Sequence, residues 1–384
     1  MCKYYIKHPL RNELNLGYFK LFSNFSAQKS FFCIKNHNFI AHKTIAMKET
    51  LSSISKRLGV SASTVSRILS GKAEQYRISE ATVAKVREEA EKCSYTPSIV
   101  AQSLRTKKTK TIGVIIPSVS NPYFADIAGA VIAEANERGY AAMILDTMEN
   151  ERNQRSCLST LVHRKVDGII AAPCGNDRAL FEEIDKSIPV VLVDRYFLDT
   201  KLSYVTNNNF KGAYDAAMFL LDHGHRNIAC IQGDKSSLPN IKRVGGFRKA
   251  LKTAGIESEP VIVGDAFSVR NGYLETKLLL NRPDRPTAIF ALSYTILLGV
   301  IRALKDSSVS VPEDMSLVSF DDNIGLDYMT PPITRVRQSV EEMGRLSTKL
   351  LFGRLTEDNA KPAQIELSAS LLIRDSVKTI LQKT

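Results

Sequence analysis

Residues 51–71 read Leu-Ser-Ser-Ile-Ser-Lys-Arg-Leu-Gly-Val-Ser-Ala-Ser-Thr-Val-Ser-Arg-Ile-Leu-Ser-Gly, and their apolar spacing decides the fold of the N-terminal region. Leu51, Ile54 and Leu58 recur at the interval that places side chains on one face of an α-helix. Gly59 follows at once, and glycine readily adopts the left-handed conformation that commonly ends a helix. The pattern predicts a short helix that stops at Gly59.

The same stretch continues into a second short helix. Ser61 can accept a hydrogen bond from the first backbone N–H groups of a helix over residues 62–69, which Gly71 ends. After a polar loop, Ser79 can begin a third helix. Short helices whose first pair is separated by a Gly-Val-Ser turn are typical of a helix-turn-helix unit, which we expect over residues 47–94.

The next segment, residues 95–110, has the composition of a linker. Pro97 is placed to start a helix, but the weakly helical turns that follow are too short to be stable alone in water. A basic run then ends at Lys110. We expect a hinge segment that becomes ordered only when something else stabilises it.

The net charge of +12 is concentrated in the first third of the chain. Residues 1–110 hold 20 Lys and Arg against 7 Asp and Glu, whereas residues 111–384 hold 32 against 33. Within the first third, residues 1–47 contribute +6 and residues 48–110 contribute +7. A basic segment beside a near-neutral body indicates a module that binds a polyanion, with nucleic acid the first candidate and an anionic membrane surface the second.

From residue 111 onward, apolar runs alternate with amphipathic stretches of helical length, such as residues 124–138. The runs have the composition of strands buried on both faces. They cover residues 112–116, 168–172, 190–193, 227–231, 288–292 and 316–320. Such alternation predicts an α/β core of doubly wound parallel sheets, and its length suits two lobes. Ligands of such sheets bind at the carboxyl ends of the strands, often between lobes.

The predicted domains follow from these patterns. We expect residues 1–46 to be a disordered extension or untranslated sequence upstream of a start at Met47. The core covers residues 111–376, and a tail covers residues 377–384. Its first lobe comprises about 111–207 plus 336–363, and its second comprises about 208–335 plus 364–376.

The cysteines are too scattered to form a metal site. They are Cys2, Cys33, Cys93, Cys157, Cys174 and Cys230, without a Cys-x-x-Cys pair. The chain has no apolar run of roughly 18 residues that could cross a bilayer, and its N-terminus lacks the features of a signal peptide. We therefore expect a cytoplasmic protein that binds no metal and no cofactor.

Five stretches occur together in an order and spacing that indicate a family. They are Leu51-x-x-Ile-x-x-x-Leu-Gly-Val-Ser-x-Ser-Thr-Val-Ser-Arg-Ile-Leu-Ser-Gly71; Tyr95-x-Pro-x-x-x-Ala-x-Ser-Leu-Arg105; Ile112-Gly-Val-Ile-Ile-Pro-x-x-x-Asn-Pro-Tyr-Phe124; Pro189-Val-Val-Leu-Val-Asp-Arg195; and Val318-x-Phe-Asp-Asp322 followed by Pro332-Ile-Thr-x-Val-x-Gln338. Over about residues 50–376 the chain resembles the lactose repressor (LacI/GalR) family of bacterial transcription factors. The resemblance implies a DNA-binding domain, a hinge helix, and a core like that of the periplasmic sugar-binding proteins. It also implies a homodimer that binds a palindromic operator and responds to a small molecule.

The resemblance places the DNA-reading residues on the second helix. Its outer face offers small and polar side chains that let the backbone approach the major groove: Ser61, Ala62, Ser63, Thr64, Ser66 and Arg67. Ala62 and Ser63 hold the positions that vary with operator sequence. The hydroxyls of Ser61, Thr64 and Ser66 would bind phosphates. Arg67 is the strongest specificity candidate, because a guanidinium can pair with guanine through two hydrogen bonds. Each serine alone could also be an ordinary cap or surface residue.

The hinge residues implied by the resemblance are Ser98, Ala101, Leu104 and Arg105. Leu104 matches the leucine that each subunit of a family member inserts into the minor groove, where an apolar wedge can open a base step. Ala101 leaves room for two hinge helices to pack, and Arg105 with the following lysines supplies charge for phosphates. The alternative is that Leu104 is a linker residue that packs on the core.

For the effector site, the resemblance implies Asp194, Arg243 and Asp321, with Arg195 a weaker addition. These groups can each bind two hydroxyls of a sugar, although an aspartate after a strand can also be only a helix cap. Because the chain has no Trp, an apolar wall must come from Phe124, Tyr123, Phe267 or Tyr294. The family's usual Asn-Asp or Ser-Asp pair is replaced here by Ser293 and Tyr294, so we expect a phenol in place of one polar contact.

Two other classes of protein are compatible with parts of the pattern. An enzyme is not expected, because the chain lacks a phosphate-binding loop, a nucleophile elbow and a His-Glu-x-x-His motif. A sugar-binding protein of the transport type would have an export signal and would lack a basic helix-turn-helix.

Only ten residues follow Arg374, too few for a tetramerising coiled coil, so a dimer is favoured. The residues leave open which effector binds and whether it acts as an inducer or a corepressor. They also leave open whether the protein represses or activates transcription.

Overall fold

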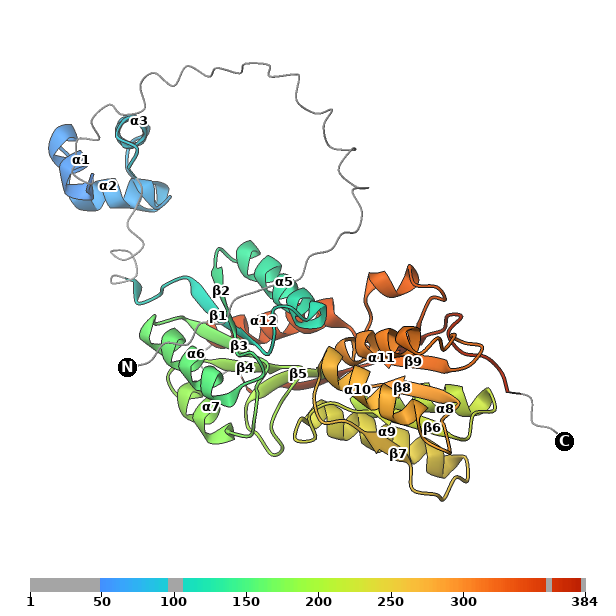
Figure 1. Cartoon of the computed structure of the whole chain (residues 1–384). Helices are drawn as coiled ribbons and strands as arrows, with labels where there is room; N and C mark the ends of the chain where they lie inside the picture. The colour runs from blue at the N-terminus through green and yellow to red at the C-terminus, as the bar shows by residue number, and fades with distance from the viewer. Residues whose placement is uncertain (1–48, 96–105, 357–360, 381–384) are drawn as a thin grey trace, which may run out of the picture. The chain divides into compact units, whose positions relative to one another are not determined.

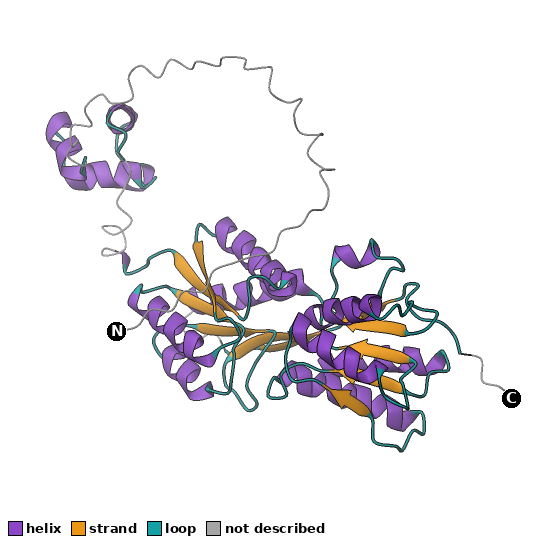
Figure 2. Cartoon of the chain, in the orientation of Figure 1, coloured by secondary structure: helices purple, strands orange, loops and turns teal. Residues whose placement is uncertain are grey.

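The computed structural model describes residues 49–95, 106–356 and 361–380 (Figure 1). The chain divides into two units, residues 1–97 and residues 98–384. Helices account for all the secondary structure described in the first unit, whereas the second combines helices and strands (Figure 2).

The first unit is a helical domain whose capping residues set the ends of its helices. It consists of α1 (Leu51–Leu58), α2 (Ala62–Leu69), the 3-10 turn η1 (Glu74–Tyr76) and α3 (Glu80–Lys92). Thr50 and Ser53 form a capping box at the start of α1, and Gly59 ends it with φ of 66°. The core consists of Ile54, Val65, Ile68, Val86 and Ala90. These elements confirm the predicted helix-turn-helix fold.

The first lobe of the second unit is built on a six-stranded parallel sheet with the order β11-β5-β4-β3-β1-β2. Its strands are β1 (Thr111–Ile116), β2 (Ala141–Asp146), β3 (Gly168–Ala171), β4 (Val190–Val193), β5 (Ser203–Asn207) and β11 (Gln364–Leu367). Its helices are α5 (Pro122–Glu137), α6 (Glu151–His163), α7 (Arg178–Asp185) and α12 (Val340–Thr356). Separate apolar clusters pack α5 and α12 on one face of the sheet and α6 and α7 on the other.

The second lobe repeats this plan with the order β12-β10-β9-β8-β6-β7. Its strands are β6 (Ile228–Ile231), β7 (Val261–Val263), β8 (Ala288–Ala291), β9 (Ser316–Phe320), β10 (Thr334–Arg337) and β12 (Ser370–Leu372). Its helices are α8 (Asn209–Asp222), α9 (Leu238–Thr253), α10 (Val269–Leu280), α11 (Tyr294–Asp306) and the 3-10 turn η2 (Ile324–Asp327). Helices α8 and α9 cover one face, and α10 and α11 cover the other. The doubly wound α/β architecture of two lobes is thus confirmed.

The structure differs from the expected parallel arrangement at one edge. Strand β12 pairs antiparallel with β10, so the second sheet is parallel except at this edge. The chain reaches β12 directly from β11, without an intervening helix to reverse its direction.

The lobe boundaries also differ from those expected near the C-terminus. Gln364–Leu367 pairs with β5 of the first lobe, although we expected residues 364–376 to belong to the second. Strand β10 likewise extends the second lobe to Arg337. The backbone of β11 completes the first sheet while its side chains alternate between exposed and half-buried, so no apolar run marks it in the sequence. The chain therefore crosses between lobes after β5, after β10 and after β11.

Close helix packing in the second lobe positions one functional side chain. Gly246 of α9 lies so near the main chain of Phe210 on α8 that a Cβ atom there would collide with it. The absence of a side chain lets the two helices approach and brings Arg243, three residues earlier on α9, beside the first residue of α8. In the part of the chain that the structure describes, no helix is long and apolar enough to cross a membrane.

Candidate functional site

The second helix of the first unit presents small polar residues at its start. Ser61 is the N-cap of α2 and accepts a 3.1 Å hydrogen bond from the backbone N–H of Thr64. Its hydroxyl also lies 2.7 Å from that of Ser63 and 2.8 Å from that of Thr64. Ser61, Ala62 and Ser63 are exposed, while Thr64 and Ser66 are half-buried. This end of α2 offers hydroxyls and little bulk, as entry into a major groove requires.

Arg67 lies further along α2, where an aromatic ring fixes its direction. The guanidinium carbon of Arg67 is 3.9 Å from the centre of the Tyr76 ring, a cation–π contact. Tyr76 itself is an exposed residue of the η1 turn. A stacked guanidinium loses less conformational freedom when it binds a base or a phosphate, so Tyr76 supports Arg67 in either role.

The four predicted hinge residues, Ser98, Ala101, Leu104 and Arg105, lie outside the described residues. The end of the linker is described, and it is attached to the first lobe. The backbone N–H groups of Thr109 and Lys110 donate to the two carboxylate oxygens of Asp167 at 2.7 and 3.0 Å. The ammonium group of Lys110 lies 4.4 Å from the centre of the Tyr140 ring. These contacts fix the point at which the linker enters the core.

The second unit contains a polar cavity between its lobes. Residues of both lobes line it: Asn121, Tyr123, Phe124, Glu149, Asp194, Arg195, Ser237, Pro239, Arg243, Phe267, Ser293 and Asp321. The cavity has a volume of only about 20 Å³, close to what one water molecule occupies. A wider cavity of about 650 Å³ adjoins it and shares Arg195 and Ser237 as lining residues.

Asp194 and Asp321 occupy equivalent places in the two lobes. Asp194 directly follows β4 of the first lobe, and Asp321 directly follows β9 of the second. Both have left-handed backbones, with φ of 62° and 76°, and both are 3% exposed. Such a conformation costs free energy in a residue with a side chain and recurs at ligand-binding sites. Each strand thus ends by turning a buried carboxylate into the space between the lobes.

Arg243 is the buried cation of the second lobe. Its Nε donates to Oδ1 of Asn209 at 2.7 Å, and Nη1 donates to the backbone oxygen of Leu292 at 2.7 Å. Nη1 also lies 3.6 Å from Oδ1 of Asp321, and the guanidinium stacks 3.8 Å from the centre of the Phe320 ring. These contacts hold the guanidinium in one orientation.

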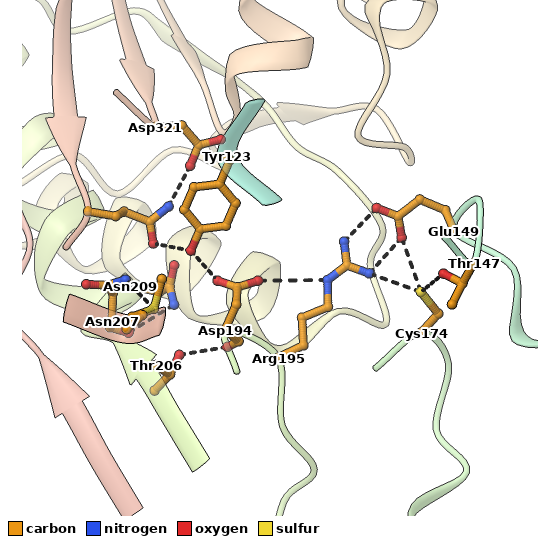
Figure 3. Close-up of polar contacts among 12 residues, drawn as sticks. Tyr123, Thr147, Glu149, Cys174, Asp194, Arg195, Thr206, Asn207, Asn209 and Asp321 are labelled. Carbon is orange, nitrogen blue, oxygen red and sulfur yellow. Dashed lines mark hydrogen bonds and ion pairs between the residues drawn. The ribbon is translucent and has the colours of Figure 1, made fainter. Parts of the chain in front are cut away.

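A chain of hydrogen bonds joins the two aspartates (Figure 3). The Tyr123 hydroxyl donates to Oδ1 of Asp194 at 2.6 Å and lies 3.2 Å from Oε1 of Gln338. Nε2 of Gln338 donates to Oδ1 of Asp321 at 2.6 Å. Gln338 immediately follows β10, where the chain crosses to the first lobe. The polar groups of the two lobes are therefore connected through a crossing segment.

A second cluster is centred on Arg195 (Figure 3). Its two terminal nitrogens donate to the Glu149 carboxylate at 2.6 and 2.7 Å. Burial lowers the pKa of Arg195, but the hydrogen bonds and charge of Glu149 outweigh it and raise the pKa above its ordinary value. Burial raises the pKa of the neighbouring Cys174 thiol to about 11, which keeps it protonated and unreactive at neutral pH.

Burial also affects the acid and the phenol on the floor of the cavity. It raises the pKa of Asp194, and the charges of Arg243 and Arg195 oppose this shift. Burial, together with the charges of Asp194 and Asp321, raises the pKa of Tyr123 well above its ordinary value. The phenol therefore remains a hydrogen-bond donor at physiological pH.

The apolar wall of the cavity comes from two phenylalanines, one from each lobe. The rings of Phe124 and Phe267 both line the cavity, and their centres lie 5.4 and 5.6 Å from the Arg195 guanidinium carbon. They can cover the faces of a flat ring while the charged groups bind its edges. Of the four aromatic residues considered for the wall, Phe124, Phe267 and Tyr123 line the cavity and Tyr294 does not.

Ser293 and Tyr294 contribute differently from what we expected. Ser293 lines the cavity, but its hydroxyl accepts a 3.2 Å hydrogen bond from the backbone N–H of Ile296 and caps α11. Tyr294 is not one of the lining residues, and its backbone N–H donates to Oδ2 of Asp321 at 3.0 Å. The phenol expected in the cavity is instead that of Tyr123, because the first turn of α11 packs the Tyr294 ring against the core.

Three further residues of the site had no role assigned from the sequence. Glu149 lies in the turn after β2, a half-exposed edge strand that was not predicted although residues 141–145 are all apolar. Asn209 and Gln338 follow β5 and β10, so a polar residue at the end of each strand was the available signal. In the described residues, no group of three His, Cys, Asp or Glu side chains could hold a metal ion.

A helix-turn-helix domain joined to a two-lobed core with a polar cavity defines a class, the DNA-binding regulators that respond to a ligand. Residues 50–98 match the bacterial regulatory proteins of the lacI family, and residues 217–377 match the periplasmic binding protein-like domain. The HTH-type transcriptional regulator DegA of Bacillus subtilis is 34% identical over 340 residues, which cover 87% of this chain and 99% of that protein. This chain belongs to the lacI family.

Other relatives and solved structures agree with this assignment. The ribose operon repressor of Escherichia coli is 31% identical over 85% of this chain and 99% of its own. The lac repressor dimer bound to operator and the anti-inducer ONPF superposes with a TM-score of 0.78 and 25% identity, over 86% of this chain and 99% of the other. A lacI-family regulator of Enterococcus faecium with bound ribose superposes with a TM-score of 0.64 and 27% identity, over 71% of this chain and 100% of the other.

Proposed function

We propose that this protein is a transcriptional repressor whose affinity for a palindromic operator is controlled by a sugar or sugar derivative bound between the lobes of its core. The observation that carries the proposal is the pair of buried carboxylates, Asp194 and Asp321, that follow strands of the two lobes and line one cavity together with Arg243. Carboxylate and guanidinium groups each bind two hydroxyls at once, and Phe124 and Phe267 supply faces for a sugar ring.

The ligands and roles of similar proteins support a sugar effector and a repressor function. One relative is a ribose operon repressor, and two solved neighbours hold ribose and cellobiose. We infer that the chain acts in the cytoplasm by binding rather than by catalysis, as a homodimer. In this proposal, residues 47–94 read the operator, residues 95–110 form the hinge, and residues 111–376 bind the effector and dimerise.

Within the DNA-binding domain, we infer that Ala62, Ser63 and Arg67 contact base edges and that Ser61, Thr64 and Ser66 contact phosphates. In the hinge, Ser98, Ala101 and Arg105 support the Leu104 wedge. Ligand binding changes the angle between lobes, shifts the dimer interface and disturbs the packing of the hinge segments. The effector needs different affinities for the two states, which typically provides about 1–3 kcal/mol of coupling.

A gel-shift experiment on the full chain tests the proposal. The protein should bind DNA from its own promoter region in the presence of excess competitor DNA, and its affinity should fall steeply with added salt. A sugar that raises the melting temperature of the protein should change the operator affinity. An Arg67→Ala variant is the control, since it should lose discrimination between operator and competitor and still bind the sugar. Failure of the wild type to select operator DNA would refute the proposal.

A further inference from the structure

The cavity contains a hydroxyl group that the protein itself supplies. Tyr123 lies on α5 and is 6% exposed, and its hydroxyl donates to Oδ1 of Asp194 at 2.6 Å (Figure 3). The other oxygen, Oδ2, lies 4.0 Å from Nε of Arg195. Asp194 would need both carboxylate oxygens to accept two adjacent hydroxyls of a ligand side by side. The phenol therefore takes up one of the acceptor positions on Oδ1 and competes there with a ligand hydroxyl.

The packing around Tyr123 keeps this hydroxyl in place. Its ring meets the Phe124 ring edge to face, with centres 5.1 Å apart and planes at 72°. It lies in the first turn of α5, directly after Pro122, and is part of the apolar cluster of the first lobe. Moving the ring away would open a void in this cluster and leave a buried carboxylate without its donor, and both changes cost free energy.

The charges that line the cavity also restrict the ligand. Asp194, Asp321 and Glu149 contribute three carboxylates, whereas Arg195 and Arg243 contribute two guanidiniums. Both cations already face carboxylates: Arg195 binds Glu149 at 2.6 Å, and Arg243 lies 3.6 Å from Asp321. An anionic ligand would meet excess negative charge without a free cation to offset it. These lining groups therefore suit a neutral ligand, and the space for one of sugar size lies in the adjoining cavity of about 650 Å³ that shares Arg195 and Ser237.

We propose that Tyr123 is the residue that sets the hydroxyl pattern of the effector: its phenol takes the place of one ligand hydroxyl on Asp194. The chain then selects a neutral sugar or polyol that presents one hydroxyl, rather than an adjacent pair, to this carboxylate. Deoxy sugars belong to that class, and sugar phosphates and sugar acids do not. This inference rests on the proposed function, because it assumes a sugar-type effector in this cavity.

Isothermal titration of the full-length protein with matched pairs of sugars tests the assignment. The probes are ribose, glucose and galactose, each beside its monodeoxy analogues at every ring carbon, together with ribose 5-phosphate and glucose 6-phosphate. In the wild type, at least one deoxy analogue should bind as tightly as its parent or more tightly, and the phosphates should bind more weakly than their parents.

The Tyr123→Phe variant should change the ratio of the affinities for a parent sugar and for its deoxy analogue. Freeing Oδ1 lets the parent sugar gain a hydrogen bond to a charged group, so preference for the parent over that analogue should rise by about 10-fold or more. Tyr140→Phe is the matched control, because Tyr140 is also buried in the first lobe and its hydroxyl bonds to an aspartate, Asp167, outside the cavity. The control should keep the wild-type ratio.

The possible results separate this inference from the proposed function. Sugar binding with the same parent-to-deoxy ratio in the wild type and in Tyr123→Phe overturns the role of Tyr123 and leaves the sugar effector standing. If no sugar binds either protein, the proposed effector class fails and the inference fails with it. Should Tyr123→Phe not fold, the wild type alone decides, and a tenfold preference for every parent sugar over all its deoxy analogues overturns the inference.

Discussion

Arg243 donates a 2.7 Å hydrogen bond from Nε to the side-chain oxygen of Asn209, the residue with which the chain enters the second lobe. Asn209 in turn donates to the backbone oxygen of Asn207 at 3.0 Å. The side-chain oxygen of Asn207 accepts the backbone N–H of Ser339, which lies in another crossing segment, at 3.2 Å. A ligand that binds Arg243 thus acts on a group that is hydrogen-bonded to one crossing segment and is linked to a second through Asn209 and Asn207.

This relationship predicts that Asn209 transmits the effector signal. Asn209→Ala removes one of the hydrogen bonds that orient Arg243, so effector affinity should fall by about threefold, and the effector's influence on operator affinity should fall further, by about 5-fold, near the lower end of typical coupling. Fluorescence anisotropy measures operator affinity with and without a sugar that stabilises the wild type, and the ratio of the two affinities gives the effector's influence. Asn240→Ala is the control, since Asn240 is an equally buried asparagine that bonds to Gly233 within the second lobe. Equal responses in both variants would contradict the role.

Asp194 should be essential for effector binding and dispensable for operator binding. Asp194→Asn removes a charged acceptor that the cavity presents to ligand hydroxyls, so effector affinity should fall about 10- to 100-fold. Titration calorimetry measures this loss, and a gel shift without effector should show unchanged operator affinity. A variant that binds the effector normally would remove Asp194 from the site.

The same residue predicts a pH dependence of effector binding. Burial raises the pKa of Asp194, so this carboxyl takes up its proton at a higher pH than an exposed aspartate does. Since the charged form is the better acceptor, effector affinity should decline as pH falls, beginning above the ordinary aspartate range. The Asp194→Asn variant should lack this decline.

Leu104 should act on DNA alone. The family resemblance makes it a wedge at the operator centre, and it lies outside the described residues. Leu104→Ala should weaken operator binding about 10-fold or more, because the stabilising contacts of the bent duplex are lost. Effector affinity, measured on the same preparation, should not change. Operator affinity equal to that of wild type would favour a linker role for Leu104.

His225 should make the core less stable in mild acid. Burial lowers its pKa, and its ring lies 2.8 Å from the Thr287 hydroxyl and 3.2 Å from the backbone oxygen of Lys378. The unfolded chain binds a proton near pH 6.5, whereas the folded chain does so only at lower pH. The stability from the neutral ring is therefore complete above about pH 6.5 and declines as pH falls towards the folded pKa. On acidification, the melting temperature of His225→Gln should fall less than that of the wild type. The control is a variant of the exposed His163, His163→Gln, whose melting temperature should fall as much as that of the wild type.

Much of the fold could be predicted because its central strands and first helices are marked by local patterns. The six predicted strands correspond to β1, β3, β4, β6, β8 and β9, which lie inside the sheets and read as apolar runs. Strands β2, β5, β7, β10, β11 and β12 were not predicted. All six lie at or next to a sheet edge. The short apolar runs of β2 and β7 were not recognised as strands, whereas polar residues interrupt the apolar run in β5, β10, β11 and β12. This is also why β11 was expected in the wrong lobe.

The sequence by itself determined the helix-turn-helix and the two α/β lobes, and it singled out Asp194, Arg243 and Asp321, which line the cavity. Caps, buried strands and strand-end residues are local features, and they remain legible along the chain. Only the tertiary structure decided that Tyr123 bonds to Asp194, that Glu149 neutralises Arg195, and that Arg243 is bonded to a crossing segment. These contacts join residues from 34 to 71 positions apart, and such pairings depend on how the strands and helices of each lobe pack. Spacing along the chain does not encode them.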